Sequence, residues 1–381
     1  MEQIFIQNIK INKVRHLEQI DLPVGECERK HIILTGKNGS GKTSVLDAVA
    51  TFIHSVTVGK NPDQIMEDIK GAAAGVWLDF NTSFVAVRKQ FEEGRFVVAY
   101  YKADRVFSSV EPKHVEKVQL KPDYAINAMP RNEFIKYLLD LKMTEALALS
   151  NGKKDKANKI SEWFGKFEDL LKKIFDDNSV RLEFDEETFK FSIVMNDREP
   201  FDFNTLSSGY AAVLDVVVDL MIRMEKQLNR SFDFNISGIV LIDEVETHLH
   251  LELQKNVMKL LTTVFPNIQF IVSSHSPFIL NSLDNVIIYD LENKMLVEHG
   301  LSDVPYSGIV EGYFGADELS DELRDKFETY KKLVNKLELD NDDYDQIADL
   351  EMYLDEIPDY LALTLTTEYQ ELKARLRARE A

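Results

Sequence analysis

The run Gly36-Lys37-Asn38-Gly39-Ser40-Gly41-Lys42-Thr43 constrains this chain more than any other stretch, because it fits the phosphate-binding pattern G-x-x-x-x-G-K-[ST]. The apolar residues 31–35 before it are typical of a buried strand. Residues 44–56 after it place apolar side chains at helical spacing. In this context glycines let backbone N–H groups surround phosphate oxygens at the start of a helix. We therefore expect a nucleotide-binding α/β sheet; the alternative is a glycine turn that binds nothing.

Two side chains of this loop carry the expected chemistry. Lys42 would place its charge against the β- and γ-phosphates, and Thr43 would offer its hydroxyl to Mg²⁺. The backbone of the whole loop and of Ser44 would make the remaining phosphate contacts. The sequence thus predicts a site for a nucleoside triphosphate and a magnesium ion.

The composition is that of a globular protein, with 381 residues and a hydrophobic content of 44%. Cys27 is the single cysteine, so an intramolecular disulfide is impossible and a cysteine metal cluster is not expected. The sequence has no recognisable signal peptide and no apolar run long enough to span a bilayer. We therefore expect a soluble, cytoplasmic protein with no membrane contact.

The formal net charge of −20 is unevenly distributed along the chain. Residues 300–381 hold 21 Asp and Glu against 9 Lys and Arg, so this last part accounts for −12. Such a chain is not drawn to nucleic acid by its bulk charge. Contact with DNA or RNA would need a local basic patch, or a partner that carries one.

Strand-like and helical patterns alternate along the chain. Besides much of 1–35, the strand-like runs lie at 76–80, 84–87, 96–101, 180–184 and 189–195. Residues from about 130 to 178 are helical in pattern, and so is the acidic tail from about Glu311. The lysine-dense turn 152–156 is either a solvated loop or a contact for nucleic acid or a partner.

Two further strand ends carry polar residues. Asp243 and Glu244 follow an apolar strand, where a magnesium-organising carboxylate and a general base belong in such a sheet. His275 follows the next apolar strand, where it can hydrogen-bond the γ-phosphate or the attacking water. Solvated loop charges are the alternative for the acidic pair. For His275 the alternative is a polar turn that caps the helix starting at Ser276-Pro277.

The stretch Leu206-Ser207-Ser208-Gly209-Tyr210 starts a further helix, and its position in the order of motifs is informative. A phosphate loop, a helical insertion, this serine-glycine start, a strand with Asp-Glu and a strand with histidine follow one another. That order resembles the head domains of ATP-binding-cassette (ABC) ATPases, including the SMC and RecF-like branch. The expected fold is therefore an α/β ABC-ATPase head with a P-loop core sheet, an antiparallel β side layer, a helical insertion and a C-terminal α-helical region.

The resemblance also implies roles for individual residues. Ser207 and Gly209 would contact the γ-phosphate of an ATP held by a second subunit, so that two heads close around two ATPs. Residues 246–250 would form the D-loop, which faces the other head. The roles implied for the remaining motifs are Glu244 as the base, His275 as the switch histidine, Lys42 on the phosphates, and Thr43 and Asp243 as ligands of Mg²⁺.

A closer resemblance is to the AAA15/AAA21 ATPases of the OLD-like group. These proteins share the run Asp-Glu-x-Glu-x-His-Leu-His, intact here at 243–250, and the turn Ser-Ser-His-Ser-Pro, intact at 273–277. The resemblance covers about residues 1–300 as an ATPase head, with a helical insertion at about 130–178. It leaves 301–381 as an acidic helical region. It implies an ATPase that forms a homodimer or a higher homo-oligomer.

Within this group the chain is most similar to ATPases of bacterial anti-phage defence that lack a fused nuclease. These work with a separate effector, an HNH or TOPRIM nuclease. The resemblance thus implies hydrolysis of ATP to ADP and phosphate, control of an effector, and contact with DNA or RNA through that partner. The acidic run 340–345 does not end an apolar strand, as a TOPRIM site would, so we expect no nuclease activity from this chain alone.

Three features depart from the ABC pattern. Tyr210 stands where the signature usually ends in Gln or Glu. No glutamine occupies a Q-loop position, and Asp104 and Arg105, shortly after Tyr101, are the nearest substitutes. The insertion is too short for a long coiled coil, which excludes a long-armed SMC architecture.

Two other functions are compatible with the motifs. A DNA-repair or DNA-end-binding clamp of the RecF/SMC type would bind duplex directly and would need a basic stripe. The nucleotide-binding subunit of a transporter would need a groove for a membrane partner. The acidic tail and the altered signature make the transporter the weakest candidate.

Overall fold

The computed structural model describes residues 3–380 apart from 26, 59–69, 106–108, 110–111, 113, 197, 230, 233, 314–319, 337 and 357–362. The chain divides into two compact units, residues 1–304 and residues 305–381. Within the described residues, no helix is both long and apolar enough to cross a membrane.

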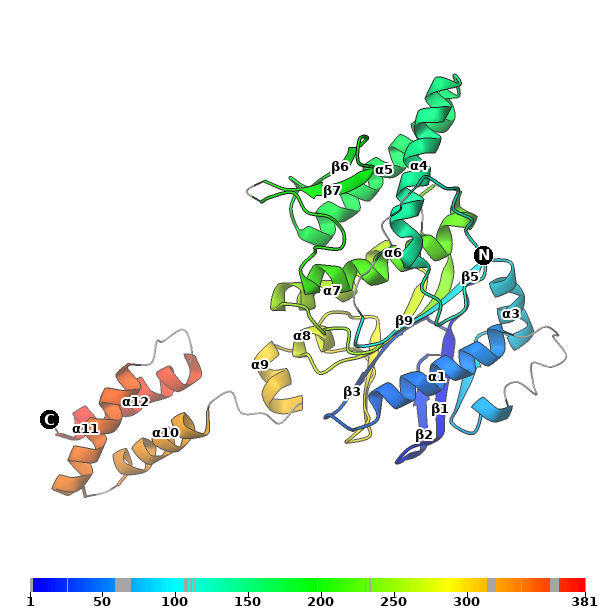
Figure 1. The fold of residues 1–381 in the computed structure, drawn as a ribbon. Helices are drawn as coiled ribbons and strands as arrows, with labels where there is room; N and C mark the ends of the chain where they lie inside the picture. Colours follow the sequence, from blue (N-terminus) through cyan, green and yellow to red (C-terminus); the bar gives the residue numbers. More distant parts are fainter. Residues whose placement is uncertain are drawn as a thin grey trace. The chain divides into compact units, whose positions relative to one another are not determined.

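A six-stranded sheet of order β11-β10-β3-β9-β8-β5 organises the first unit (Figure 1). Neighbouring strands are parallel except at the edge, where β11 is antiparallel to β10. The strands are β3 (His31–Thr35), β5 (Phe96–Tyr101), β8 (Ser237–Ile242), β9 (Ile268–Ser273), β10 (Val286–Asp290) and β11 (Met295–Val297). The parallel strands are buried along their whole length, which explains their continuous apolar runs.

The carboxyl ends of the parallel strands line up at one edge of this sheet. Ile242 of β8 pairs with Tyr101 of β5 and with Val272 of β9. Leu34 of β3 in turn pairs with Ser273, the last residue of β9. The segments that follow these strands are therefore neighbours, which is where open α/β sheets bind ligands.

The helix α1 (Lys42–Thr57) lies between this sheet and a smaller antiparallel sheet of order β2-β1-β4. The smaller sheet contains β1 (Ile6–Val14), β2 (Leu17–Pro23) and β4 (Val76–Phe80). Val49, Phe52 and Ile53 of α1 belong to one hydrophobic cluster with residues of both sheets. The expected fold class is thus confirmed, with a parallel core sheet, an antiparallel side layer and separate helical regions.

One expected strand is wrong. Residues 84–87 begin the helix α3 (Phe84–Glu92) instead. The Ser83 hydroxyl accepts a hydrogen bond from the N–H of Ala86 at 3.3 Å and so caps this helix. Val87 and Phe91 are buried one helical turn apart. A cap and a buried face therefore outweigh the strand preference of the aromatic and β-branched residues.

The helical insertion forms a hairpin that projects from the first unit (Figure 1). Its elements, with those that follow, are η2 (Pro130–Glu133), α4 (Phe134–Ser150), α5 (Lys154–Phe175), β6 (Arg181–Asp185), β7 (Lys190–Val194), α6 (Ser208–Leu228), α7 (Leu251–Val264) and α8 (Pro277–Leu280). Leu147 is 63% exposed near the end of α4, although its spacing suits the apolar face. Unlike the exposed end of α4, helix α6 is buried at every residue from Ala211 to Glu225.

The second unit is a small helical bundle. Its elements are α9 (Tyr306–Gly308), η3 (Ile309–Tyr313), α10 (Asp321–Val334), α11 (Asn341–Asp355) and α12 (Leu363–Glu380), and the last three share a hydrophobic core. Asp340 caps α11, because its carboxylate accepts from the N–H of Asp343 while the Asp343 carboxylate accepts from the N–H of Asp340. The acidic run 340–345 is therefore a capped helix start.

Candidate nucleotide-binding site

The phosphate loop leaves β3 at Gly36 and enters α1 at Lys42. Gly36, Gly39 and Gly41 have φ angles of 126°, 87° and 101°, a left-handed region that disfavours side chains. A Cβ at Gly36 would lie 2.9 Å from the Ser40 Oγ, so this turn also lacks room for one. The loop exposes Lys37, Asn38 and Gly39 and buries Ser40. Backbone N–H groups at the start of a long helix remain for an anion.

The Lys42 side chain turns back over its own loop. Its Nζ donates to the carbonyl oxygens of Gly36 at 2.8 Å and Lys37 at 3.1 Å. Burial lowers the pKa of Lys42, while nearby carboxylates, Glu244 foremost, act in the opposite direction. Among the described residues its hydrogen-bond acceptors are these neutral carbonyl oxygens, and a buried ammonium group so placed is well suited to exchange them for phosphate oxygens.

Asp243 is held at the end of β8 by its neighbours on β9 and β5. Its carboxylate accepts a hydrogen bond from the Ser273 Oγ at 2.5 Å, and its N–H donates to the Tyr101 carbonyl at 2.8 Å. Asp243 is 3% exposed. A buried carboxylate at a strand end beside Lys42 is a suitable magnesium ligand, since Mg²⁺ prefers oxygen donors and retains several waters.

Glu244 sits in an unusual backbone conformation, with φ 45°. Such a conformation costs on the order of 1–3 kcal/mol for a residue with a side chain, and such strain clusters at functional sites. Two contacts to β9 hold it: the Glu244 N–H donates to the Ser273 Oγ at 2.7 Å and the Val245 N–H donates to the Ser273 carbonyl at 3.1 Å. The Glu244 carboxylate accepts from the Thr247 hydroxyl at 3.1 Å.

Arg105 supports the same segment from the carbonyl side. Its Nη1 donates to the carbonyl oxygen of Asp243 at 2.8 Å, and its Nη2 donates to those of Glu244 at 3.1 Å and Val245 at 3.0 Å. Arg105 is 6% exposed. The sequence marks Arg105 only as a substitute for a missing glutamine, and no sequence signal indicates that it binds this backbone.

His275 and Glu246 meet at the edge of the site. The His275 N–H donates to Oε1 of Glu246 at 2.5 Å. Burial, together with the charge of Lys42, lowers the pKa of His275, so its imidazole is neutral at neutral pH. Ser276 accepts from the N–H of Phe278 at 3.2 Å, so the capping interpretation of this turn also holds.

Buried polar atoms around the loop offer a test of whether a magnesium nucleotide fits. Among the described residues, four buried side-chain atoms here lack a hydrogen-bond partner: Thr35 Oγ1, Ser40 Oγ, Glu246 Oε2 and His275 Nε2. Buried polar groups rarely stay unsatisfied. They stand beside Lys42, Asp243 and a helix N-terminus, a set of donors and oxygens that fits a phosphate chain with its metal ion.

The serine-glycine start lies at the N-terminus of α6. Ser207 and Ser208 are exposed, whereas Gly209 is buried and a Cβ there would lie 3.0 Å from the His248 carbonyl oxygen. The Tyr210 ring packs on Phe175, with ring centroids 4.5 Å apart. Among the described residues, neither Ser207 nor Gly209 forms a hydrogen bond with the phosphate loop of the same chain.

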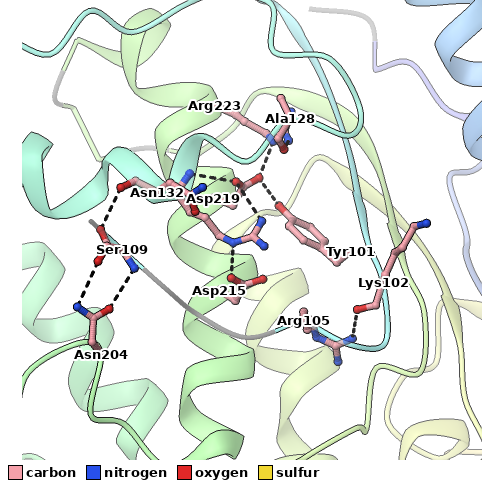
Figure 2. Close-up of polar contacts among 11 residues, drawn as sticks. Tyr101, Lys102, Arg105, Ser109, Ala128, Asn132, Asn204, Asp215, Asp219 and Arg223 are labelled. Atoms are coloured by element: carbon pink, nitrogen blue, oxygen red, sulfur yellow. Dashed lines mark hydrogen bonds and ion pairs between the residues drawn. The ribbon is translucent and has the colours of Figure 1, made fainter. Parts of the chain in front are cut away.

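A buried ionic network connects α6 to β5 (Figure 2). Asp219 accepts from the Tyr101 hydroxyl at 2.8 Å, from Nε of Arg223 at 2.6 Å and from the N–H of Arg131 at 3.2 Å. Arg131 also forms an ion pair with Asp215. Asp215, Asp219 and Arg223 are spaced at i, i+4 and i+8 on α6 and therefore form one buried polar stripe.

Two acidic residues at the end of β10 and just beyond it also reach the loop, and the sequence gives no hint of them. Asp290 lies close to Gly36, since a Cβ on this glycine would be 3.3 Å from its Oδ1. The Glu292 carboxylate accepts from the backbone N–H of Lys37 at 3.2 Å and pairs with its Nζ at 3.1 Å.

Comparison with known proteins finds a family and several curated relatives that are similar to this chain. The sequence pattern of the family described as "AAA domain, putative AbiEii toxin, Type IV TA system" matches residues 116–281. Septu protein PtuA of Bacillus mycoides is 24% identical over 88% of this chain and 48% of its own length. A probable ATPase of retron Ec83 from Escherichia coli is 33% identical over 34% of this chain and 25% of its own length. The chain thus spans about half or less of these two curated relatives.

Among solved structures, the SMC head domain from Thermotoga maritima aligns with 74% of this chain and 94% of its own, at 13% identity and a TM-score of 0.37. The family match and the PtuA match confirm the expected resemblance to ABC-like ATPases of this group.

Proposed function

We propose that this chain binds and hydrolyses ATP as one half of a nucleotide-closed dimer, and that the dimer controls a separate effector in anti-phage defence. One observation carries the ATPase proposal: the aligned strand ends bring the phosphate loop, the Asp243-Glu244 pair and His275 to one edge of the sheet. The resemblance to PtuA and to the retron ATPase supports the setting.

Each residue of the site then has a defined task. Lys42 leaves the carbonyl oxygens of its loop and binds the β- and γ-phosphates. Thr43 and Asp243 would hold Mg²⁺, which supplies charge neutralisation for the transferring phosphate. The loop backbone from Gly36 to Ser44 binds the remaining phosphate oxygens.

Glu244 and His275 act on the attacking water. The Glu244 carboxylate takes the proton of this water as general base. The neutral imidazole of His275, with a buried Nε2 free to bond, orients the water or the γ-phosphate. The Glu246 carboxylate fixes the His275 backbone at that place.

A second copy of the chain completes the site in this proposal. Ser207 is exposed at the start of α6, and helix N-termini bind anions. Gly209 and Ser207 would contact the γ-phosphate held by the other copy, with residues 246–250 between the two sites. Because both sites need both chains, ATP closes the dimer and hydrolysis opens it.

The effector would be a separate nuclease of the HNH or TOPRIM type, and DNA or RNA would be reached through it. The net charge of −20 disfavours direct contact with nucleic acid.

One observation favours the alternative of a RecF/SMC-like DNA clamp: Lys153, Lys154 and Lys156 are exposed at the tip of the α4–α5 hairpin. Salt-dependent duplex binding by the purified chain, lost when these lysines become glutamines, would support that alternative.

A sizing experiment tests the dimer. Glu244→Gln keeps the shape of the base but cannot take a proton, so Mg·ATP should hold this variant as a dimer while hydrolysis stops. Glu252→Gln, on the exposed start of α7, is the matched control and should keep wild-type turnover. A Glu244→Gln variant that binds ATP and remains monomeric would contradict the closed-dimer proposal.

A further inference from the structure

We propose that Arg105 is a positioning residue that fixes the backbone from which the Glu244 carboxylate extends. The inference rests on the proposed function, in which Glu244 is the general base. Within the part of the chain that the structure describes, Arg105 donates to backbone carbonyl oxygens and forms no hydrogen bond with the Glu244 carboxylate. It acts on the chain that carries this side chain.

The contacts of Arg105 are unusually concentrated. Its two terminal nitrogens donate to the carbonyl oxygens of three consecutive residues, 243, 244 and 245, and Nη1 also reaches the Lys102 carbonyl at 3.2 Å. Carbonyl oxygens that point to one place repel one another and lose their water when buried. A planar guanidinium with separate donors satisfies them together, which a compact ammonium group cannot do.

The conformation of Glu244 shows why such support is required. Its φ of 45° is disfavoured for any residue with a side chain, so the surroundings must hold it. The N–H groups of residues 243, 244 and 245 are bound to Tyr101 and Ser273. With Arg105 on the three carbonyl groups, both sides of this segment are fixed. Without the hydrogen bonds from Arg105, the strained turn at Glu244 could relax, and the Glu244 carboxylate would move.

Arg105 also faces the buried network of α6. Burial lowers the pKa of Arg105, and the Asp215 carboxylate is foremost among the nearby charges that act in the opposite direction. Asp215 in turn forms an ion pair with Arg131 at the root of the helical insertion. Figure 2 shows Arg105 beside this network, on the segment that follows β5. The support of Glu244 is therefore connected through buried charges to the helix that begins with Ser207-Ser208-Gly209.

The test is Arg105→Lys in the full chain, with Arg88→Lys as the matched control. Arg88 is equally buried, at 2% exposed, and bonds Glu92 within α3, outside the candidate site. Binding of Mg·ATP and thermal unfolding are measured first to establish that both variants fold. We expect Arg105→Lys to bind ATP as the wild type does, with kcat lowered about 10- to 100-fold, because a small displacement of a catalytic group has this effect.

A second readout does not depend on turnover. Amide hydrogen exchange of residues 243–247 should accelerate about tenfold or more in Arg105→Lys, while residues 36–44 exchange as in the wild type. Unchanged exchange together with unchanged kcat would overturn the inference, and so would faster exchange across the whole first unit. A wild-type chain that never hydrolyses ATP would contradict the proposed function alone, since the exchange still decides whether Arg105 fixes this segment.

Discussion

The backbone N–H of His275 donates to the carboxylate of Glu246 at 2.5 Å, so the turn after β9 is tied to the segment that follows β8. Each of the two side chains keeps one buried polar atom without a partner among the described residues, Nε2 of His275 and Oε2 of Glu246. The contact thus holds these two unsatisfied groups at the edge of the phosphate loop. Substitution of Glu246 should therefore change both the pKa of His275 and the stability of the protein.

Glu246→Gln should lower the pKa of His275 further. The Glu246 charge favours the imidazolium, so its loss leaves burial and the Lys42 charge to act with less opposition. A hydrogen bond to a charged acceptor also weakens, which should cost ~1–2 kcal/mol of unfolding free energy. NMR titration of the His275 ring resonances measures the first effect and urea unfolding the second. A His275 pKa that rises in this variant would contradict the interpretation.

Lys42→Met should separate nucleotide binding from stability. The variant loses a buried charge and two hydrogen bonds to neutral carbonyl oxygens, so its unfolding free energy without nucleotide should stay within ~1 kcal/mol of the wild type. Mg·ATP at a hundred times its Kd should stabilise the wild type by about 2.7 kcal/mol and leave the variant unchanged. Thermal unfolding with and without Mg·ATP measures both. Equal stabilisation of the two proteins would argue against the role of Lys42.

His31 should make folding sensitive to acid. Its Nδ1 accepts from the N–H of Phe270 at 3.1 Å, and burial lowers the pKa of His31 from 6.5 to about 3. The unfolded chain therefore binds the proton first, and the stability from His31 is lost as the pH falls below about 6.5, at about 1.4 kcal/mol per unit. His31→Asn keeps an acceptor without this titration. The stability difference between wild type and variant should shrink by about 2 kcal/mol between pH 7 and pH 5.

Asp215 should contribute a slope of the opposite sign. Burial raises the pKa of Asp215 from 3.8 to about 7, so the folded state keeps its proton longer than the unfolded chain does. The contribution of Asp215 to the free energy of unfolding is fully present below about pH 4. It falls by about 3–4 kcal/mol in total as the pH rises towards 7. In the wild type the His31 and Asp215 contributions offset each other over this pH range. The free energy of unfolding of Asp215→Asn should therefore rise more steeply with pH than that of the wild type. Parallel profiles for the two proteins would contradict the prediction.

Asp219→Asn should destabilise the first unit strongly. Asp219 is fully buried and accepts hydrogen bonds from Tyr101, Arg223 and the Arg131 N–H. Removal of its charge leaves the Arg223 guanidinium without its carboxylate partner, which costs ~3–5 kcal/mol in buried pairs. Asp169→Asn, whose side chain is 69% exposed, is the control and should change stability by less than ~0.5 kcal/mol. Similar losses in the two variants would show that the network adds nothing to stability.

The sequence predicts the core of the site because its motifs follow strands. Gly36, Asp243 and His275 each come directly after a buried apolar run or one residue later, and parallel strands bring their carboxyl ends together. The structure therefore confirms the fold class from a pattern that is local in sequence.

Sequence motifs do not identify residues whose side chains bind the backbone. Arg105 binds carbonyl oxygens, which every residue carries, so no partner side chain marks its role. Glu292 likewise reaches a backbone N–H of the phosphate loop from 255 positions away. The wrong strand at 84–87 has a related cause, because the Ser83 hydroxyl that caps the helix also binds a backbone group, the N–H of Ala86.

The contact of Gly209 with the His248 carbonyl oxygen has a consequence for any partner of this surface. Because a Cβ on Gly209 would lie only 3.0 Å from this oxygen, a larger residue at position 209 would press the beginning of α6 against the turn after Glu246. One of the two segments would then have to shift. A molecule that contacts both segments would meet an altered surface, although the substitution lies in only one of them.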